Sequence, residues 1–519
     1  MTAPGRVHVV HGDLTRLACD DVLIPTDADL RIEDPWRSLV TEHEARAAVS
    51  ERLWGEGGMR ACVVSRGTDD DPRRVWVVEV GSWQDRPLEW YLDGVVAAFA
   101  ALGERAGGPR LVALPLIGTG EGGLARRRGE LITGLLDVLD EQARTYGIDV
   151  ALVTWTRSDY AAVQAVRAER DTALDPRLEA HARRIAGEAV EDRLVLFLGA
   201  GVSAAAGLPA WWELLERLAG YGAEDLHRAL PEVRGETASE VLRAELRSLG
   251  TLDAAELLRK ALGPAVVEAV ARELQQDRYS LTHALLASLR TAKTITTNYD
   301  RLYELAAARP FAELGGLAVL PWDAAERGRP WLLKMHGDVD RPESIVLSRG
   351  DFAEYDASRR PLGSLLQAQM MTGHLLFVGS SMTDDNVLRL AHEVRQLRAE
   401  WCATSRPVGT VLTLADEPLR RSLWEGTLDF VLVGASGEPS ADGNDTRLLQ
   451  AFLDRVSVLA SVERSYLLDP TYDAIVGRNA TLRDALASLA KATSDLPEGS
   501  DERVVEQVRG LLARLGWSG

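Results

Sequence analysis

The chain has 519 residues, which is too long for one ordinary domain and predicts two to four. Hydrophobic residues make up 46% of it and charged residues 26%, which excludes a disordered or fibrous protein. The formal net charge of −19 disfavours a dedicated nucleic-acid binder, because it repels polyphosphate. It still permits a small nucleotide ligand, which backbone amides at helix starts can hold.

No run of about 18 uninterrupted apolar residues occurs, so a membrane-spanning helix is not predicted. The N-terminus lacks the charged-then-apolar pattern of a secretory signal. The three cysteines, Cys19, Cys62 and Cys402, are scattered and form no CxxC pair. Neither a structural zinc site nor a disulfide framework is therefore predicted, and a reduced cytoplasmic protein without a metal fits best.

The first part of the chain alternates short apolar runs with longer helical patterns. Strands are predicted at residues 7–10, 21–24, 61–65, 75–80, 111–116 and 150–155, and helices at 90–106 and 126–146. Such alternation predicts a mainly parallel sheet covered on both faces. Residues 158–192 are rich in Ala, Arg and Glu, and they are predicted to form one or two connecting helices.

A second α/β pattern begins with a strand at 194–198, which ends abruptly in Gly199-Ala-Gly201. The composition of residues 211–289 predicts a helical insertion. Strands then return at 294–297, 332–335, 375–378, 408–414 and 430–433. Residues 435–445 read as a loop, and helices are predicted at 446–461, 480–492 and 504–515.

Four glycine-rich or polar segments follow predicted strands of this second region. Because open α/β sheets bind ligands at the carboxyl edge of their strands, we expect the four to meet there. Glycines allow close backbone approach, and a helix start offers N–H groups to a pyrophosphate. Taken singly, each segment is more simply a structural turn. The segments are FLGAGVS (197–203), TTNYD (296–300), KMHGD (334–338) and FVGSSM (377–382).

Together and in this order, GAGVSAAAGLP, TTNYD, KMHGD and VGSSMTDDN resemble the sirtuin fold, and in detail the bacterial sirtuin-like NADases of antiphage defence, the Thoeris-like effectors. The resemblance covers nearly half of the chain and implies NAD+ as the substrate. It implies that Asn298 positions the ribose or the attacking water, that Asp300 faces the nicotinamide carboxamide, and that His336 is the catalytic histidine. The NAD-binding residues that it implies are Gly199, Ala200, Gly201, Ser203, Gly379, Ser380 and Ser381.

The chemistry of these residues suits that reaction. Cleavage of the nicotinamide–ribose bond passes through an oxocarbenium-like state and needs an oriented nucleophile. A histidine such as His336 can accept a proton from a ribose hydroxyl or from water near neutral pH. A neutral amide such as that of Asn298 can orient a hydroxyl or water without adding charge.

Protein deacylation is less favoured than NAD+ hydrolysis or cyclisation. Sirtuin deacylases ordinarily carry a four-cysteine zinc module after the HG motif, whereas about forty residues separate His336 from Gly379 here and none is a cysteine. Residues 342–352 occupy that space and resemble a segment of the NADase branch. ADP-ribosyl transfer and a non-enzymatic nucleotide-responsive scaffold stay open as alternatives, and so do linear and cyclic products.

The N-terminal part resembles the macro domain, an ADP-ribose-binding module, through HGDLT (11–15) and LPLIGTGEGG (114–123). The resemblance implies that Asp13 recognises the adenine amino group and that Gly118, Thr119 and Gly120 wrap the phosphates and distal ribose. IPTD (24–27) stands where macro domains usually have Asn-Ala-Ala-Asn, and residues 55–58 poorly match their first glycine-rich loop. Asn-dependent ADP-ribose hydrolysis is therefore not expected, and a scaffold without a ligand is the alternative.

We therefore predict an α/β protein with a macro-like nucleotide-sensing domain at 1–157, followed by a Rossmann-like sirtuin domain. A helical linker spans 158–192, the NAD-cleaving domain with its helical insertion spans 193–440, and a helical C-terminal region spans 441–519. The fusion suggests that an ADP-ribose-derived nucleotide on the first domain gates the NADase. Thoeris-type effectors divide the labour similarly, but with the sensor after the catalytic domain. A homo-oligomer is expected, without membrane or nucleic-acid partners.

Overall fold

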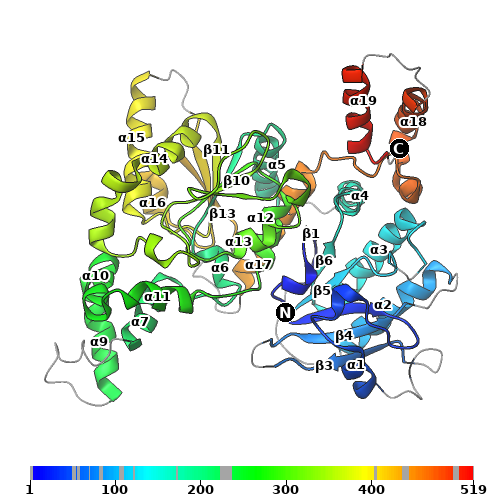
Figure 1. Cartoon of the computed structure of the whole chain (residues 1–519), viewed down its shortest axis with the longest axis horizontal. Coiled ribbons are helices and arrows are strands. Elements are labelled where there is room, and N and C mark those ends of the chain that lie inside the picture. Colours follow the sequence, from blue (N-terminus) through cyan, green and yellow to red (C-terminus); the bar gives the residue numbers. More distant parts are fainter. Residues whose placement is uncertain are drawn as a thin grey trace. The chain divides into compact units, whose positions relative to one another are not determined.

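A computed structural model describes residues 4–49, 54, 59–68, 71–80, 86–103, 110–120, 123–170, 174–221, 236–401, 406–434, 443–494 and 502–517. Its contacts divide the chain into two compact units, Met1–Ala186 with Gln450–Gly519, and Gly187–Leu449. Each unit is built on its own sheet, with helices packed around it (Figure 1). The predicted α/β class is confirmed by this architecture.

The first unit contains a six-stranded sheet in the order β1-β6-β5-β2-β4-β3. All neighbouring strands are parallel except β3, which runs antiparallel to β4. All six predicted strands of this region are confirmed. The strands are β1 (Val7–His11), β2 (Asp21–Thr26), β3 (Ala61–Ser65), β4 (Arg74–Glu79), β5 (Leu111–Pro115) and β6 (Asp149–Thr154).

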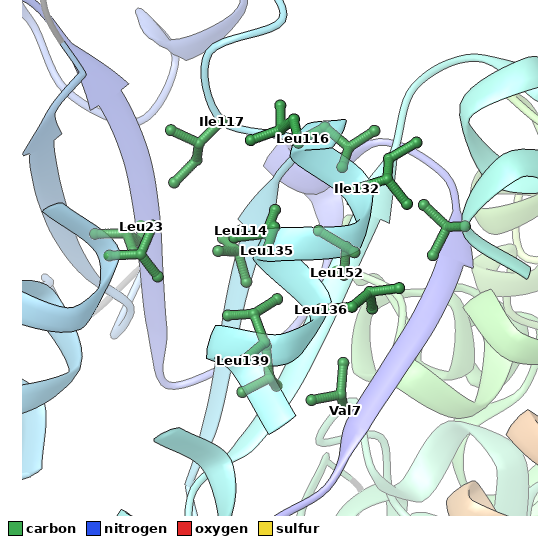
Figure 2. Close-up of a cluster of buried hydrophobic side chains, with 14 of the residues drawn as sticks. Val7, Leu23, Leu114, Leu116, Ile117, Ile132, Leu135, Leu136, Leu139 and Leu152 are labelled. Carbon is green, nitrogen blue, oxygen red and sulfur yellow. The ribbon is translucent and has the colours of Figure 1, made fainter. Parts of the chain in front are cut away.

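Helices bury this sheet through regularly spaced apolar residues. On α3, Leu135 and Leu139 are four residues apart and lie on one face of the helix. They pack with Leu114 and Leu152 of the central strands (Figure 2). Gly147 ends α3 in a left-handed conformation. The helices of this part of the chain are α1 (Glu42–Ala48), α2 (Leu88–Gly103), α3 (Arg128–Tyr146), α4 (Arg157–Ala168) and α5 (Pro176–Val190).

The C-terminal part of the chain completes the first unit. The Oδ1 atom of Asp454, on α17, accepts the backbone N–H of Val9 at 3.1 Å, and both carboxylate oxygens accept from Arg167 at 2.9 and 2.5 Å. Because β1 is an edge strand, this contact covers a backbone group that the sheet leaves unpaired. The elements are α17 (Asn444–Ala460), η6 (Pro470–Ile475), α18 (Ala480–Ser494) and α19 (Glu502–Arg514).

The second unit has a seven-stranded sheet in the order β13-β12-β11-β7-β8-β10-β9, and all its strand pairs are parallel. The predicted strands of this region are confirmed. The short strand β9 was not predicted, because three residues show no periodicity. The strands are β7 (Leu194–Leu198), β8 (Lys293–Thr296), β9 (Ala318–Leu320), β10 (Trp331–Lys334), β11 (His374–Val378), β12 (Gly409–Thr413) and β13 (Leu428–Leu432).

The predicted helical insertion is present between β7 and β8 in the described residues. It contains α6 (Gly201–Ala204), α7 (Trp211–Tyr221), α9 (Glu236–Leu249), α10 (Thr251–Leu262), α11 (Ala265–Glu273) and α12 (Leu281–Ser288). The later helices are α13 (Leu302–Ala307), α14 (Arg349–Thr372), α15 (Asp385–Trp401) and α16 (Pro418–Leu423). Most of the predicted loop at 435–445, Cys402 and the glycines of 55–58 lie outside the described residues.

Within the described ranges, no helix is both long and apolar enough to cross a membrane.

Candidate active site

The four segments singled out in the sequence lie at one edge of the second sheet. Each directly follows a strand, namely β11, β7, β8 or β10, and these four strands are consecutive neighbours in the sheet. The strands are parallel, so their carboxyl ends share an edge. The expectation that the segments meet is confirmed. The order also reverses at β7, which lies between β11 and β8, and such a switch point is where open α/β sheets bind ligands.

Glycines let two of these segments touch through their backbones. The N–H of Gly201 donates to the carbonyl of Gly379 at 2.9 Å, and that of Gly199 donates to Val378 at 3.0 Å. Gly379 has φ +65, and a Cβ there would lie 2.4 Å from the backbone nitrogen of Val202. A side chain at Gly379 would therefore separate the two loops. Ala200 and Gly201 are exposed beside this junction.

Asn298 lies just beyond β8 and is oriented by the glycine loop. Its Nδ2 donates to the carbonyl of Gly199 at 3.1 Å and to Ser203 Oγ at 3.3 Å. Its backbone N–H donates to Thr296 Oγ1 at 3.0 Å. The side chain is half-buried, with the amide nitrogen held by protein acceptors. The opposite end of the amide, Oδ1, is the end that this arrangement leaves for a ligand.

Asp300 and Ser203 are more buried than the sequence suggested. Ser203 is 2% exposed, and its Oγ donates to Asp300 Oδ2 at 2.8 Å. The other carboxylate oxygen, Oδ1, accepts the backbone N–H of Leu302 at 3.0 Å and so supports the start of α13. Both side chains therefore help to hold the loops of the site in place.

His336 follows β10 and is almost fully buried against aromatic rings. Phe352 and Tyr355, both on α14, meet its imidazole edge-on, with ring centroids 5.1 and 5.9 Å away. The carbonyl of His336 accepts the N–H of Val346 at 2.8 Å. The aromatic walls restrict the orientation of the imidazole.

The protonation of His336 reflects this environment. Burial lowers the pKa of His336 below its ordinary value, and the charge of Arg359 acts in the same direction, whereas Asp384 opposes both. The Nε2 atom lies 3.3 Å from Asp384 Oδ2, but without the alignment of a hydrogen bond. A neutral imidazole with an unengaged ring nitrogen can accept a proton at neutral pH.

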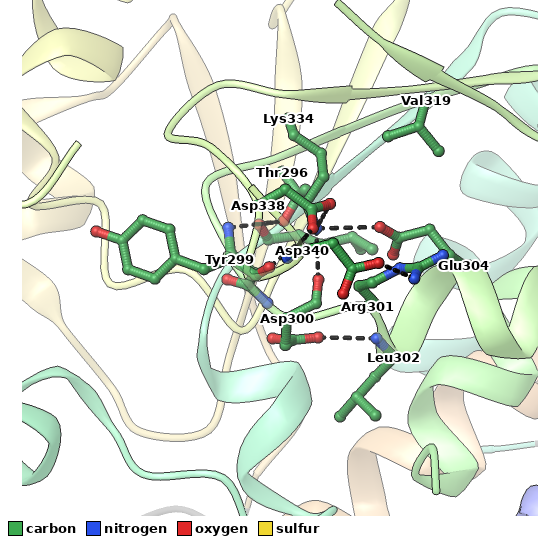
Figure 3. Close-up of polar contacts among 12 residues, drawn as sticks. Thr296, Tyr299, Asp300, Arg301, Leu302, Glu304, Val319, Lys334, Asp338 and Asp340 are labelled. Carbon is green, nitrogen blue, oxygen red and sulfur yellow. Dashed lines mark hydrogen bonds and ion pairs between the residues drawn. The ribbon is translucent and has the colours of Figure 1, made fainter. Parts of the chain in front are cut away.

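Lys334 connects the loop that follows β8 to the loop that follows β10 (Figure 3). Its side chain is fully buried, and its Nζ donates to the carbonyls of Tyr299 and Asp300 at 3.0 and 2.6 Å. Nζ also contacts Glu304 at 3.0 Å and Asp338 at 2.8 Å. Burial alone would lower the pKa of Lys334, but the two carboxylates outweigh it and raise the pKa, so the ammonium stays charged.

Sequence reasoning missed His283 on α12, whose Nε2 lies 3.4 Å from Ser203 Oγ. A local signal existed, because Ser280 and His283 have the spacing of a capping box before an apolar run. Ser380 and Ser381, by contrast, were singled out. Ser380 Oγ accepts the N–H of Met382 at 3.3 Å, and the exposed Ser381 hydrogen-bonds Thr383 through the hydroxyls at 2.6 Å.

The residues singled out in the first unit lie at the carboxyl edge of its sheet. Asp13 follows β1, and its Oδ1 accepts from the backbone and hydroxyl of Thr15 at 2.9 and 2.7 Å. Gly118 follows β5 with φ +89, and Thr119 Oγ1 donates to the carbonyl of Leu116 at 2.8 Å. The exposed Gly120 faces Glu33, whose Oε2 would lie 3.2 Å from a Cβ at that position. A carboxylate thus lies against the turn.

No group of three or more His, Cys, Asp or Glu side chains among the described residues is arranged to hold a metal ion.

Part of the second unit matches the model of a known family. Residues 292–427, which include β8, β10, β11 and the segments around Asn298, His336 and Gly379, match the SIR2-like domain. This agrees with the parallel sheet and with the placement of the four segments. The match supports the resemblance to sirtuins, whereas the macro-like character of the first unit has no counterpart in it.

One individual relative has a name that refers to defence, and two others are named NAD(+) hydrolases. The chain is 25% identical over 213 residues to "Defense-associated sirtuin 2" of Bacillus subtilis. The aligned residues make up 40% of this chain and 20% of that protein. It is 26% identical over 243 residues to "NAD(+) hydrolase ThsA" of Bacillus cereus (strain MSX-D12), and these residues make up 44% of this chain and 46% of that protein. A ThsA of Acinetobacter baumannii (strain 532279) is 28% identical over 218 residues, 41% of each chain. The chain thus spans less than half the length of these relatives.

Proposed function

We propose that the second unit is an NAD+ glycohydrolase that releases nicotinamide and ADP-ribose, or a cyclic form of it. The observation that carries the proposal is the juxtaposition of two strand ends. Lys334 of β10 is paired with Thr296 of β8, and these strands lead directly to His336 and Asn298. The two relatives named NAD(+) hydrolase and the SIR2-like match support NAD+ as the substrate.

The roles of the residues follow from their surroundings. Asn298 would present Oδ1 to a ribose hydroxyl or to water, and His336 would accept the proton that leaves it. Asp300 would face the nicotinamide carboxamide with lone pairs not used by Ser203 and Leu302. The pyrophosphate would lie on the loop backbone, and the ribose next to it. The residues proposed to contact NAD+ are Gly199, Ala200, Gly201, Gly379, Ser380 and Ser381. Ser203, which the resemblance also places on NAD+, is buried and is proposed to support the loop from the protein side.

Purified full-length protein, assayed with and without ADP-ribose and cyclic ADP-ribose isomers, is expected to consume NAD+. Asn298→Ala is expected to lower this rate by about 100-fold or more, because the nucleophile loses its orienting partner. The measurement is nicotinamide release, with the product resolved as linear or cyclic by chromatography. Asn479→Ala, which lies in the other unit, is the matched control and should keep full activity. Binding of NAD+ without turnover in any condition would favour a nucleotide-responsive scaffold. Deacylation of an acetylated peptide would favour the deacylase alternative.

The first unit is proposed to be a macro-like sensor that gates this activity. Its strand order and the position of Asp13 and Gly118 at one sheet edge support an ADP-ribose-like ligand. Glu33 beside Gly120 disfavours an additional negative charge there, so the ligand would have to place its phosphates away from it. The activity would act in antiphage defence by NAD+ depletion, in the cytoplasm and from a homo-oligomer.

Isothermal titration of full-length Asn298→Ala with ADP-ribose and cyclic ADP-ribose isomers is expected to show binding. Asp13→Asn should weaken it about tenfold, because a charged acceptor for the adenine amine is lost. Glu33→Gln should tighten it several-fold, since a nearby like charge disappears. The full chain is needed because α17 completes the first unit. Absence of heat with every ligand, or unchanged affinity in Asp13→Asn, would contradict the sensor; Asp137→Asn, an exposed residue on α3, is the control.

A further inference from the structure

A buried histidine, His283, contacts the candidate active site through Ser203. His283 on α12 is 1% exposed. Its Nε2 lies 3.4 Å from Ser203 Oγ, and its Nδ1 lies 2.8 Å from Ser280 Oγ. His283 is too deep to touch NAD+ itself, so any part it plays must pass through Ser203.

The capping box of α12 determines which ring nitrogen carries the proton. The backbone N–H of Ser280 donates to His283 Nδ1 at 3.4 Å. A backbone amide can only donate, and the hydroxyl of Ser280 lies closer to Nδ1, at 2.8 Å, than to the carbonyl of Val202, at 3.3 Å. Both contacts therefore favour Nδ1 as an acceptor. Burial lowers the pKa of His283 to about 4, although Asp300 opposes this, so the ring is neutral at pH 7. A neutral imidazole has one N–H, which here is on Nε2 and faces Ser203.

The hydroxyl of Ser203 is then fully occupied. It has one hydrogen and two lone pairs. The hydrogen goes to Asp300 Oδ2, which is a pure acceptor when ionised and lies at 2.8 Å. One lone pair accepts from His283 and the other from Asn298 Nδ2 at 3.3 Å. Ser203 therefore has no hydrogen left to give to Asn298.

This occupancy, together with the carbonyl of Gly199, decides which way the Asn298 amide points. The two ends of a carboxamide are nearly isosteric and are told apart by their partners. If Oδ1 faced inward, it would meet an acceptor on Ser203 and a second acceptor, the carbonyl of Gly199. Both partners instead select Nδ2, so Oδ1 points outward.

We propose that His283 is a positioning residue that, through Ser203, holds the Asn298 amide with Oδ1 toward the substrate. The proposal rests on the NAD+ glycohydrolase assignment for its kinetic consequence. The substrate class that it implies presents a donor, a hydroxyl or a water, to Asn298. Without the His283 N–H, one lone pair of the buried Ser203 hydroxyl is left without a donor, so this hydroxyl can rotate away from Asn298 and the carbonyl of Gly199 becomes the only fixed partner of the amide nitrogen.

The test compares two substitutions of His283 in the full-length protein. His283→Leu removes the donor and is expected to lower kcat for NAD+ cleavage about 10- to 100-fold, with KM changed by less than about threefold. His283→Gln can restore an N–H toward Ser203, and its kcat should return to within about threefold of wild type. His374→Leu is the matched control, because His374 is also buried in this unit and hydrogen-bonds Thr410 at 2.8 Å, away from this cluster. It should lose stability but keep kcat.

Three outcomes would overturn the proposal. One is wild-type kcat in a folded His283→Leu. Another is an equal loss in His374→Leu, which would mean that kcat only follows stability. The last is a His283→Gln that is no better than His283→Leu. A cycle with Ser203→Ala adds a criterion, because His283→Leu should have no further effect once Ser203 is absent.

A readout without turnover separates this proposal from the proposed function. Long-range ¹H–¹⁵N NMR of histidine-labelled full-length protein reports the tautomer of each ring, and His283→Gln assigns the signal. The proton on Nε2 at pH 7 is expected, and a proton on Nδ1 would overturn the proposal. If the wild-type protein cleaves no NAD+ but shows this tautomer, the glycohydrolase assignment fails while the orientation of Asn298 stands.

Discussion

Replacing His336 with Gln in the full-length protein is expected to reduce kcat/KM for NAD+ cleavage by about 100- to 10,000-fold. That range is what a positioned general base contributes. Gln has a similar reach and can keep hydrogen bonds, but it does not accept a proton at neutral pH. Because Phe352 and Tyr355 still wall the site, the loss should reflect chemistry rather than collapse of the pocket. His392→Gln on α15 is the control and should retain activity.

The pH dependence of the same reaction tests the electrostatic part of this argument. The base must be neutral, so activity falls as the pH drops through the pKa of His336. Burial lowers that pKa below 6.5, which places the acid limb below pH 6.5 and leaves a plateau at neutral pH. Asp384 raises the pKa, so Asp384→Asn should move the limb to still lower pH. Asn keeps the N-cap of α15, where Asp384 Oδ1 accepts the N–H of Val387 at 2.9 Å.

Asp385→Asn removes an exposed carboxylate next in sequence and should leave the profile unchanged. A shift of the Asp384→Asn limb to higher pH, or an acid limb that persists in His336→Gln at the same pH, would show that another group titrates. Residual activity of His336→Gln near that of wild type would remove this histidine from the mechanism.

Lys334→Met is expected to destabilise the second unit by about 3–5 kcal/mol, which is the usual effect of leaving a buried charge without its partner. Both Glu304 and Asp338 would lose their counterion, and the carbonyls of Tyr299 and Asp300 would lose a donor. Urea denaturation monitored by circular dichroism measures the change. Because the carbonyl of Asp300 is two residues from Asn298, NAD+ turnover should fall as well.

A second substitution identifies the cause. Burial raises the pKa of Glu304, and Lys334 opposes this. Glu304→Gln in the Lys334→Met background should therefore recover part of the lost stability, because one orphaned charge is removed. Lys491→Met is the control, since Lys491 is exposed on α18 and should change stability by less than about 0.5 kcal/mol. Equal midpoints for Lys334→Met and Lys491→Met would show that the buried cluster contributes little.

Local patterns were enough to predict both sheets and the edge where the site lies. Apolar runs of four to six residues, such as Leu194–Leu198, are bounded by glycines or polar turns, and this information is contained in a few neighbouring residues. The segments around Gly199, Asn298, His336 and Gly379 could be placed on one edge because parallel strands end on the same side. None of this required knowledge of which strands are neighbours.

Long-range contacts decided the rest. The hydrogen bond from the N–H of Val9 to Asp454 joins residues 445 positions apart and depends on packing that no local pattern encodes. Contacts of this kind assign the C-terminal helices to the first unit. Likewise, Lys334 and His283 read as an ordinary strand end and a helix cap in the sequence. They acquire a role only when folding buries them beside partners from other loops and helices, because a buried donor or charge must find its counterpart within hydrogen-bond distance.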